Sequence, residues 1–298
     1  LWNHVSSIGY AITAVGVLVF LIMLAEAAIR RRPGVDNPWG EGATTLEWTL
    51  SSPPPHHQFN ELPVVKDDEG VWFIPTDYAY TAIAYNTKEV TAEEVASLQV
   101  FTDPKFAGRI SMPDNADDIW SLAFLATGVT AWDNVTDEQF QAAADWLRSV
   151  HPNVRAYWAD PSEQTQLMMS GEVLVAWSWN DGVALLQAEG FPVGFQREAK
   201  EGASTFVCGW VNMKDGPGNE DKLYDFVNSW LRHDAAKALV EGLGYGHSNK
   251  VGMSEIAPEE LVTAGLQPVN ALSLPQVPND PSLRERQLQE FELIKQGF

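Results

Sequence analysis

An apolar run near the start of the chain limits its possible folds more than any other feature. Residues 8–29 (IGYAITAVGVLVFLIMLAEAAI) contain one ionisable side chain, Glu26, near the end of the run. A helix of this length crosses a hydrocarbon core of about 30 Å. A buried helix of a soluble domain is the alternative, but such a helix seldom stays apolar on every face for so long. The run therefore predicts one transmembrane helix.

The charges that flank this run predict its orientation. Arg30, Arg31 and Arg32 follow it directly, whereas the residues before it include no Lys or Arg. By the positive-inside rule, the segment that follows the helix faces the cytoplasm. The chain begins at Leu1, and no charged segment of a signal peptide precedes the run, so we expect a truncated start.

Three short motifs follow the predicted helix, at residues 37–40 (NPWG), 45–50 (TLEWTL) and 51–55 (SSPPP). Together with the helix they resemble the C-terminal end of cytochrome c oxidase subunit I, over residues 1–63. The resemblance implies a last membrane helix and a cytoplasmic tail. That family binds haem and copper through histidines on earlier helices, which this sequence does not contain. We therefore expect no cofactor, and we do not expect His4, His56 or His57 to bind metal.

The net charge and the cysteine content exclude several kinds of site. The formal net charge of -21 argues against a nucleic-acid partner, which is held by clustered Lys and Arg. Cys208 is the only cysteine, so the chain has neither an intramolecular disulfide nor a thiolate metal cluster. The simplest role for Cys208 is that of a small buried apolar residue.

The composition changes at residues 63–70 to that of an acidic domain with strands and helices. Residues 71–86 have the bias of strands, with a break predicted at residues 75–77 (PTD). Further elements are predicted as a buried strand at 173–179 and as helices at 137–150, 221–231 and 235–243. This alternation predicts an α/β class with a mixed sheet.

A series of motifs in this second part carries another resemblance. In order they are FIP at 73–75, TAIAYN at 81–86, FAGRI at 106–110, DNA at 114–116, MSGEV at 169–173, WSWN at 177–180, EGA at 201–203 and GYGHSN at 244–249. From residue 71 to residue 298 the sequence resembles the polyamine-type (spermidine/putrescine) periplasmic solute-binding proteins of ABC transporters, without their N-terminal part. Each motif is short, and their order and spacing carry the resemblance.

The second resemblance implies an incomplete two-lobed fold of the type II periplasmic-binding-protein kind. We expect its α/β lobes to be preceded by one transmembrane α-helix. The implied divisions are 1–33 (transmembrane helix and flank), 34–70 (extended Pro-rich tail and junction), 71–84 with 208–249 (remnant of the first lobe), and 85–207 with 250–298 (second lobe). A remnant lobe is expected to expose apolar surface that its missing strands would cover.

The resemblance also implies a ligand site between the lobes. A polyamine needs carboxylates for its ammonium groups and aromatic faces for its methylene groups. The positions that match are Asn115, Asp118, Trp179, Asp181, Phe206 and Tyr245. Two departures reduce the negative charge of this site, because Asn115 replaces a carboxylate and Cys208 stands where an aspartate is usual. A less charged amine is therefore an alternative ligand.

Structural roles for the same residues remain open at this point. Residues 113–118 form a good helix start with a capping side chain and an acidic first turn. Trp177 and Trp179 point to the same side of a predicted strand, so at least one of them can belong to the core. Tyr245 lies among glycines, as a loop residue does, and loops often carry function.

The two resemblances predict a solute-binding component of an ABC transporter, not an enzyme, fused to a membrane tail of oxidase origin. Its partners are then a small amine or polyamine, an ABC permease, and the membrane through residues 8–29. The alternative is a fragment of cytochrome c oxidase subunit I with an unrelated appendage. The solute-binding family works in the periplasm, whereas the arginines keep the second part in the cytoplasm. We therefore expect a chimeric or truncated gene product.

Overall fold

The computed structural model describes residues 65–67, 70–132, 134–212, 218–276 and 280–298. The chain divides into two compact units, Leu1–Glu61 and Leu62–Phe298. The first unit lies wholly outside the described residues, so the predicted transmembrane helix at 8–29 and the Pro-rich tail stay predictions. Within the described ranges, no helix has the length and apolar character needed to cross a bilayer.

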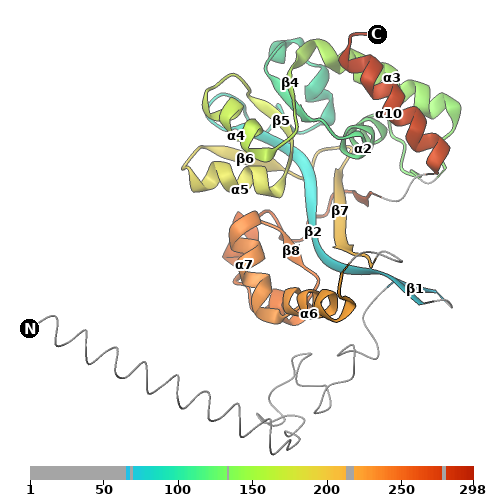
Figure 1. The fold of residues 1–298 in the computed structure, drawn as a ribbon. Coiled ribbons are helices and arrows are strands. Elements are labelled where there is room, and N and C mark those ends of the chain that lie inside the picture. Colours follow the sequence, from blue (N-terminus) through green and yellow to red (C-terminus); the bar gives the residue numbers. More distant parts are fainter. Residues whose placement is uncertain (1–64, 68–69, 133, 213–217, 277–279) are drawn as a thin grey trace, which may run out of the picture. The chain divides into compact units, whose positions relative to one another are not determined.

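One long strand, β2 (Gly70–Asn86), organises the second unit. It pairs antiparallel with β1 (Val65–Asp67), β5 (Val175–Trp179), β6 (Val193–Gln196), β7 (Ala203–Trp210) and β8 (Gly246–His247). Figure 1 shows β2 running through the middle of this unit, with β5 and β6 near one end and β8 near the other. The strand therefore connects elements that are distant in the sequence.

The break predicted at residues 75–77 is wrong, because β2 is continuous there. The pairing of β2 with β7 instead shifts register between Pro75 and Asp77. Proline has no N–H to donate, and a bulge accommodates it without ending the strand. Beyond the bulge the register with β7 runs unshifted from Asp77 to Thr81.

The other strands complete a mixed sheet of order β4-β3-β5-β2-β7-β9. β3 (Ile110–Pro113) lies parallel to both β4 (Val154–Trp158) and β5, and β9 (Ser273–Pro275) lies parallel to β7. Parallel neighbours joined by helices and antiparallel pairs on β2 occur together. The predicted α/β class with a mixed sheet is confirmed.

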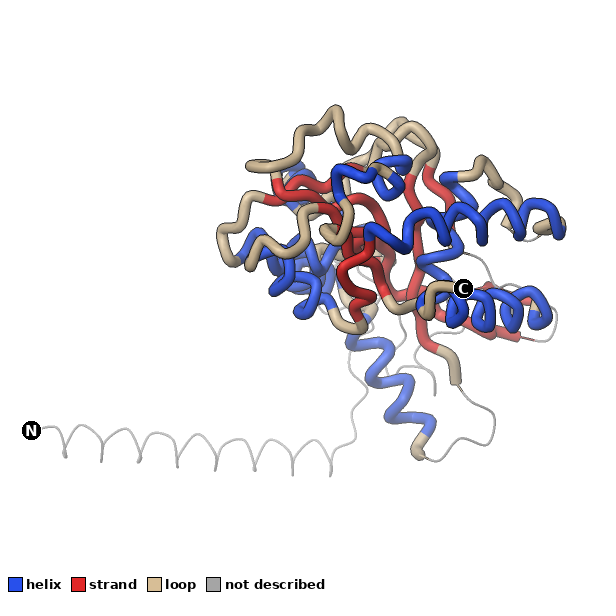
Figure 2. The backbone as a smooth tube through the Cα atoms, turned by 90° about the horizontal axis from the view of Figure 1, so that it is seen from above, coloured by secondary structure: helices blue, strands red, loops and turns tan. Residues whose placement is uncertain are grey.

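Helices surround this sheet, as Figures 1 and 2 show. The 3₁₀-helices are η2 (Leu98–Thr102), η3 (Pro104–Phe106) and η4 (His151–Asn153). The α-helices are α2 (Ala116–Ala126), α3 (Asp137–Val150), α4 (Pro161–Met169), α5 (Asn180–Ala188), α6 (Glu220–Trp230), α7 (His233–Leu243), α8 (Lys250–Ser254), α9 (Pro258–Thr263) and α10 (Pro281–Lys295). The predicted helices at 137–150, 221–231 and 235–243 correspond to α3, α6 and α7.

Local sequence explains where these helices begin and end. Thr136 and Gln139 form a capping box at the start of α3, each side chain accepting a hydrogen bond from the other residue's backbone N–H. The last residue of α7 is followed by Gly244, whose φ of 66° is the left-handed conformation that ends many helices. These signals lie within a few residues of the boundaries that they fix.

A large apolar core lies around α2, α3 and β5. Trp120 and Trp177 are among its fully buried residues, and Trp177 makes an edge contact with Phe101 at 6.1 Å between ring centroids. Trp177 therefore has the core role that its buried strand allowed. Smaller clusters lie under α6, around Val227, and beside α7, around Val240.

The predicted division into lobes stays a prediction, and the structure adds two facts about that region. Gly252 of α8, assigned to the second lobe by sequence, packs against His233 at the start of α7. Phe226 on α6 and Leu243 on α7 are large apolar residues left exposed. An apolar pocket of about 270 Å³ lies along α7, lined by Trp230, Ala235, Ala238, Leu239 and Leu243.

Candidate functional site

The first turn of α2 places a carboxylate next to β2. Asn115 is the N-cap residue, and its side-chain oxygen accepts hydrogen bonds from the backbone N–H groups of Asp117 and Asp118 at 2.9 and 3.3 Å. Acidic residues in a first turn interact favourably with the positive end of the helix dipole. The predicted helix start is confirmed, and the oxygen of Asn115 is engaged in capping.

Asp118 is the most buried carboxylate of the site, with 3% of its surface exposed. Its Oδ1 accepts hydrogen bonds from the hydroxyl of Thr81 and from Nε2 of Gln276, both at 2.8 Å. Its Oδ2 accepts one from the indole Nε1 of Trp179 at 3.0 Å. A carboxylate can accept about four hydrogen bonds, so three donors leave Asp118 with room for one more.

The neighbouring acids have cationic partners, whereas Asp118 has none among the residues that the structure describes. Asp117 forms an ion pair with Arg284, and Asp114 forms one with Lys295 at 2.7 Å. Among the described residues no Lys, Arg or His forms an ion pair with Asp118. Burial raises the pKa of Asp118 to about 6, against the opposite effect of its three hydrogen-bond donors.

A row of aromatic rings extends from Asp118 across the site. Trp179 contacts Trp158 at 4.9 Å and Phe206 at 6.4 Å between ring centroids. Phe206 in turn contacts Tyr245 at 5.6 Å. All three contacts are edge-to-face arrangements, a favourable geometry for aromatic pairs. Trp179, Phe206 and Tyr245, which we call the aromatic row, are each half-buried.

A second carboxylate lies at the far end of the aromatic row. Asp181 is in the first turn of α5, and its side chain is hydrogen-bonded to that of Tyr245. Burial raises the pKa of Asp181, and burial beside the Asp181 carboxylate raises the pKa of Tyr245. Tyr245 lies in the short loop between α7 and β8, as its glycine-rich surroundings predicted.

The register of β2 shows which residues share the site's face of the sheet. Residues that lie directly opposite in paired strands project to the same face. The pairs are Asp77 with Cys208, Ala79 with Phe206, and Thr81 with both Ser204 and Trp179. Because side chains alternate along a strand, Asp77, Ala79 and Thr81 all point to the face of the aromatic row.

The prediction that Cys208 is buried is wrong, because the residue is exposed. Position 208 is near the end of β7, where strand neighbours cover less of it than they cover Ala203 at the start. Partial desolvation, with the carboxylate of Asp77 beside it, raises the pKa of the Cys208 thiol to about 12. The thiol therefore stays protonated at neutral pH.

The structure brings most of the predicted site residues together. Asp118, Trp179, Phe206, Tyr245 and Asp181 form one connected set. Asn115 lies at the cap of the same helix as Asp118, with its oxygen turned to the backbone. As ligand-binding residues all six remain predictions.

Three further members of the set were not found from the sequence. They are Thr81, Asp77 and Gln276. The only sequence signal for Thr81 and Asp77 is the alternation of side chains between the two faces of β2. The break that was predicted at residues 75–77 concealed this alternation. Gln276 is separated from Asp118 by 158 positions and carries no local signal.

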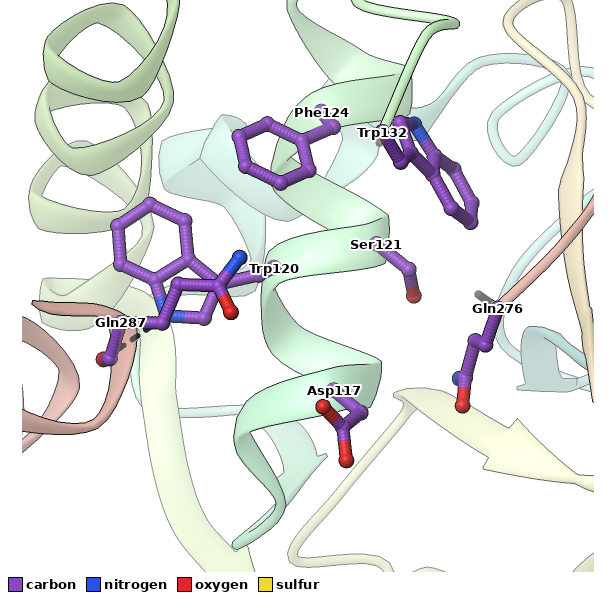
Figure 3. A pocket seen from close by; sticks show the side chains of 7 residues that line it. All are labelled: Asp117, Trp120, Ser121, Phe124, Trp132, Gln276 and Gln287. Carbon is purple, nitrogen blue, oxygen red and sulfur yellow. Dashed lines mark hydrogen bonds between the residues drawn. The ribbon is translucent and has the colours of Figure 1, made fainter. Parts of the chain in front are cut away.

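A small cavity lies beside this set, on another side of α2. Figure 3 shows Trp120, Ser121 and Phe124 on α2, with Gln276 and Gln287 approaching from two sides. Trp120 donates a hydrogen bond to the carbonyl of Gln287 at 2.9 Å. The cavity holds about 20 Å³, which is room for about one water molecule. It is too small to be the solute site.

Comparison with known proteins decides the family. The sequence profile of the bacterial extracellular solute-binding proteins matches residues 58–254, which is more than half of the chain. The chain belongs to this family. The family relatives are named as binding proteins, and the prediction that the chain is not an enzyme is confirmed at the level of the family.

Curated relatives support the resemblances of both parts. This solute-binding protein is 27% identical to the spermidine/putrescine-binding periplasmic protein of Escherichia coli over 194 residues, 65% of this chain and 54% of the relative. It thus spans about half the length of that relative. It is also 45% identical over 69 residues to cytochrome c oxidase subunit 1 of Cereibacter sphaeroides, 23% of this chain and 12% of the oxidase.

Solved structures agree on the fold. A putative spermidine/putrescine ABC transporter protein from Listeria monocytogenes superposes with a TM-score of 0.66 at 20% sequence identity. The match covers 78% of this solute-binding protein and 72% of the Listeria chain. The predicted periplasmic-binding-protein-like α/β fold is confirmed at this level.

Proposed function

We propose that the chain binds a small organic cation, a polyamine or a related amine, as the solute-binding component of an ABC transporter. The observation that carries the proposal is the buried Asp118, which has no ion pair within the described residues and touches an aromatic row. The name of the Escherichia coli relative, a spermidine/putrescine-binding protein, supports the same class of ligand.

Electrostatics favours a cation at this position. An ionised carboxylate taken out of water costs several kcal/mol unless another charge compensates it. Asp118 is buried and Asp181 half-buried, and neither has an ion pair in the described part of the chain. An ammonium group bound at either carboxylate supplies the missing charge there through charge-assisted hydrogen bonds.

The aromatic row suits the rest of such a ligand. Faces of Trp, Tyr and Phe attract cations, at about 0.5–2 kcal/mol for each contact, and they also pack against methylene groups. Trp179 is held in place by its hydrogen bond to Asp118 and by its contact with Trp158. A ring fixed on both sides loses little conformational entropy when a ligand arrives.

The proposal also assigns partners and location. A solute-binding protein of this family works outside the cytoplasm, where it delivers its ligand to an ABC permease in the membrane. The oxidase-like segment then acts as a membrane anchor fused to the binding part. A chimeric gene product explains why arginines that favour a cytoplasmic location come before a domain whose family works outside the cytoplasm. A function as an oxidase fragment is not favoured, because the oxidase match covers 12% of that relative.

The test is calorimetric titration of the purified 298-residue chain, in mild detergent at pH 7.5, with 1,4-diaminobutane, spermidine and butylamine. We expect binding of at least one of these amines and none of a neutral sugar. The variant D118N is expected to lower the affinity about ten- to hundredfold, the usual effect of losing a hydrogen bond to a charged group.

A matched control lies at the adjacent position. D117N removes the same charge one residue away, but Asp117 is paired with Arg284, so the affinity should change less than threefold. Equal losses of affinity in D117N and D118N would show that Asp118 acts only through the net charge of the protein and not through direct contact with the ligand. Absence of binding by every amine would refute the proposed function.

A further inference from the structure

A buried histidine connects three elements that lie away from Asp118. His247 of β8 is 2% exposed. Its Nε2 donates a hydrogen bond to the carbonyl of Trp230, the last residue of α6, at 2.9 Å. Its Nδ1 accepts one from the backbone N–H of Asn249 at 2.8 Å, and its own backbone N–H donates to Sδ of Met253 in α8 at 3.1 Å. We call residues 230–231 together with residues 246–253 the junction.

The two ring contacts of His247 define its charge state. A backbone N–H only donates, so Nδ1 has to offer a lone pair to Asn249. A carbonyl only accepts, so Nε2 has to carry the proton that it donates to Trp230. The ring is therefore the neutral tautomer with both nitrogens engaged. In the protonated ring both nitrogens are donors, and the hydrogen bond from Asn249 is lost.

Other contacts of Asn249 extend the effect of that loss to both neighbouring helices. Its side-chain oxygen accepts a hydrogen bond from the N–H of Gly252 at 3.0 Å, as the N-cap of α8. Its Nδ2 donates to the carbonyl of Leu231, the C-cap of α6, at 2.8 Å. The preceding residue, Ser248, donates its backbone N–H to the carbonyl of Thr76 on β2 at 2.8 Å. A shift of Asn249 therefore disturbs the start of α8 and the end of α6 together.

The charged groups near His247 come from the elements that pack against β8. Asp77 lies opposite it on β2, and its carboxylate favours the protonated ring. Where α7 and α8 meet, His233 and Glu255 interact with each other at 3.2 Å. The other charged residues of α6, α7 and α8 are exposed. Burial lowers the pKa of His247 and outweighs the hydrogen bond to Trp230 and the charge of Asp77, which act in the opposite direction.

We propose that His247 is a pH switch, which keeps the junction closed while its ring is neutral and opens it when the ring is protonated. The closed junction offers Nδ1 a donor and no acceptor, so it accommodates only the neutral ring. The short loop that carries Tyr245 leads directly into β8, so opening of the junction also loosens that side of the candidate site. The switch is independent of the identity of the solute.

The direction of the pH effect follows from the burial of the ring. In the open junction the imidazole is in water and has the ordinary pKa of 6.5, whereas burial lowers the pKa in the closed junction. The open form therefore binds the proton better. Closure is fully favoured above about pH 6.5 and is lost as the pH falls below that value. At pH 5 the protonated form of an imidazole in water exceeds the neutral form about thirtyfold, which sets the largest expected increase in opening.

Hydrogen exchange of the 298-residue chain in mild detergent, at pH 7.5 and at pH 5.0, tests the switch. Protection factors of the junction, corrected for the intrinsic pH dependence of exchange, should fall about five- to thirtyfold at the lower pH. Protection of α3, which packs in the main core, should fall much less. Local exchange is the appropriate measurement, because the raised pKa of Asp118 changes global stability in the opposite direction.

Three variants assign the effect to the ring. H247Q keeps a donor for the carbonyl of Trp230 but does not titrate, so its junction should keep its protection at pH 5.0 within about twofold. H233Q is the matched control, because it removes a partly exposed histidine of α7 and should leave the loss in place. If H247Q does not fold, D77N replaces it. Without the opposite carboxylate, the midpoint of the loss should move to a lower pH.

The results that would overturn the switch are equally definite. One is a wild-type junction whose protection is the same at both pH values. Another is a loss in H247Q as large as that in the wild type. An unshifted midpoint in D77N would likewise assign the loss to a group other than His247. Abolition of the loss by H233Q would assign it to the contact between His233 and Glu255.

Discussion

Asp117 and Asp118 are neighbours in α2 with the same side chain, yet their surroundings differ. Asp117 is partly exposed and forms an ion pair with Arg284 of α10. Asp118 points into the sheet, where Thr81, Trp179 and Gln276 donate hydrogen bonds to it and no described cation reaches it. The side of the helix on which each residue lies therefore decides whether its charge is compensated.

The raised pKa of Asp118 predicts a pH dependence of stability. The folded protein holds this proton up to a pKa of about 6, whereas the unfolded chain releases it near 3.8. Between these values the folded state binds more protons, so the free energy of unfolding falls as the pH rises from about 4 to about 7. The loss assigned to this group is about 3 kcal/mol at most. Urea unfolding of the ligand-free chain across this range measures it.

Two variants separate Asp118 from other titrating groups. D118N should remove most of this decline, because an amide does not titrate, whereas D117N should keep it. A decline of equal size in D118N and the wild type would show that another group causes it. A bound amine should oppose the decline, because it stabilises the ionised form of Asp118.

At single positions the sequence predicted which residues lie close together better than it predicted the burial and hydrogen bonds of each residue. The resemblance named Asp118 and Trp179 as members of one site, and these two residues form a hydrogen bond in the structure. It did not indicate that the oxygen of Asn115 caps α2 or that Cys208 is exposed. It missed Asp77, because a Pro-Thr-Asp sequence is typical of a turn, and only the pairing with β7 shows that the strand continues.

Helices α7 and α8 illustrate how close packing depends on a single glycine. A β-carbon added at Gly252 would lie 2.4 Å from the carbonyl oxygen of His233 and 2.7 Å from Cβ of Ala236. Both of these atoms belong to α7, and one of them is in the backbone, so a side-chain rotation cannot relieve the clash. The two helices approach this closely only because residue 252 has no side chain.

The variant G252A is therefore expected to lower the free energy of unfolding by about 1–3 kcal/mol, the usual cost of overpacking. G242A is its matched control, because Gly242 lies in α7 with nothing within 4 Å of the added carbon. Alanine there should stabilise the helix by up to about 1 kcal/mol. Urea unfolding distinguishes the two, and equal effects would contradict the close contact.

At the level of elements, helices were predicted best, because their capping and apolar-spacing signals lie within a few neighbouring residues. The capping box and the apolar spacing of α3 are contained within its own residues, and its predicted limits match the structure. The pairing of β2 depends on partners far along the chain, such as β5 and β7, and no local pattern encodes that choice. Short strands such as β8 and β9 were not predicted for the same reason.

For the whole molecule, one chain contains matches to two unrelated protein families. The profile of the solute-binding family begins at residue 58, and the oxidase match extends over 69 residues. The charge pattern of the first part and the family of the second part imply opposite sides of a membrane. The side of the membrane on which the second part lies depends on the orientation of the apolar run at 8–29. This run lies outside the described residues.

The 298-residue chain is expected to remain with the membrane fraction after extraction at alkaline pH, because residues 8–29 are long enough to span a bilayer. Deletion of residues 8–29 should release it to the supernatant. Quantitative immunoblotting of both fractions measures the partition. Full release of the intact chain would contradict the predicted transmembrane helix.

The hydrogen bond between Gln276 and Asp118 has a consequence for synthesis on the ribosome. The two residues are 158 positions apart, and at 5–20 residues per second the ribosome needs about 8 to 30 s to travel between them. A nascent chain therefore carries Asp118 for that time without one of its three donors. β2 likewise emerges well before β7, with its edge unpaired. The candidate site with its acidic and aromatic residues is thus one of the last parts of the protein to form. Chaperones that shield the edge of β2 should act before the site has formed.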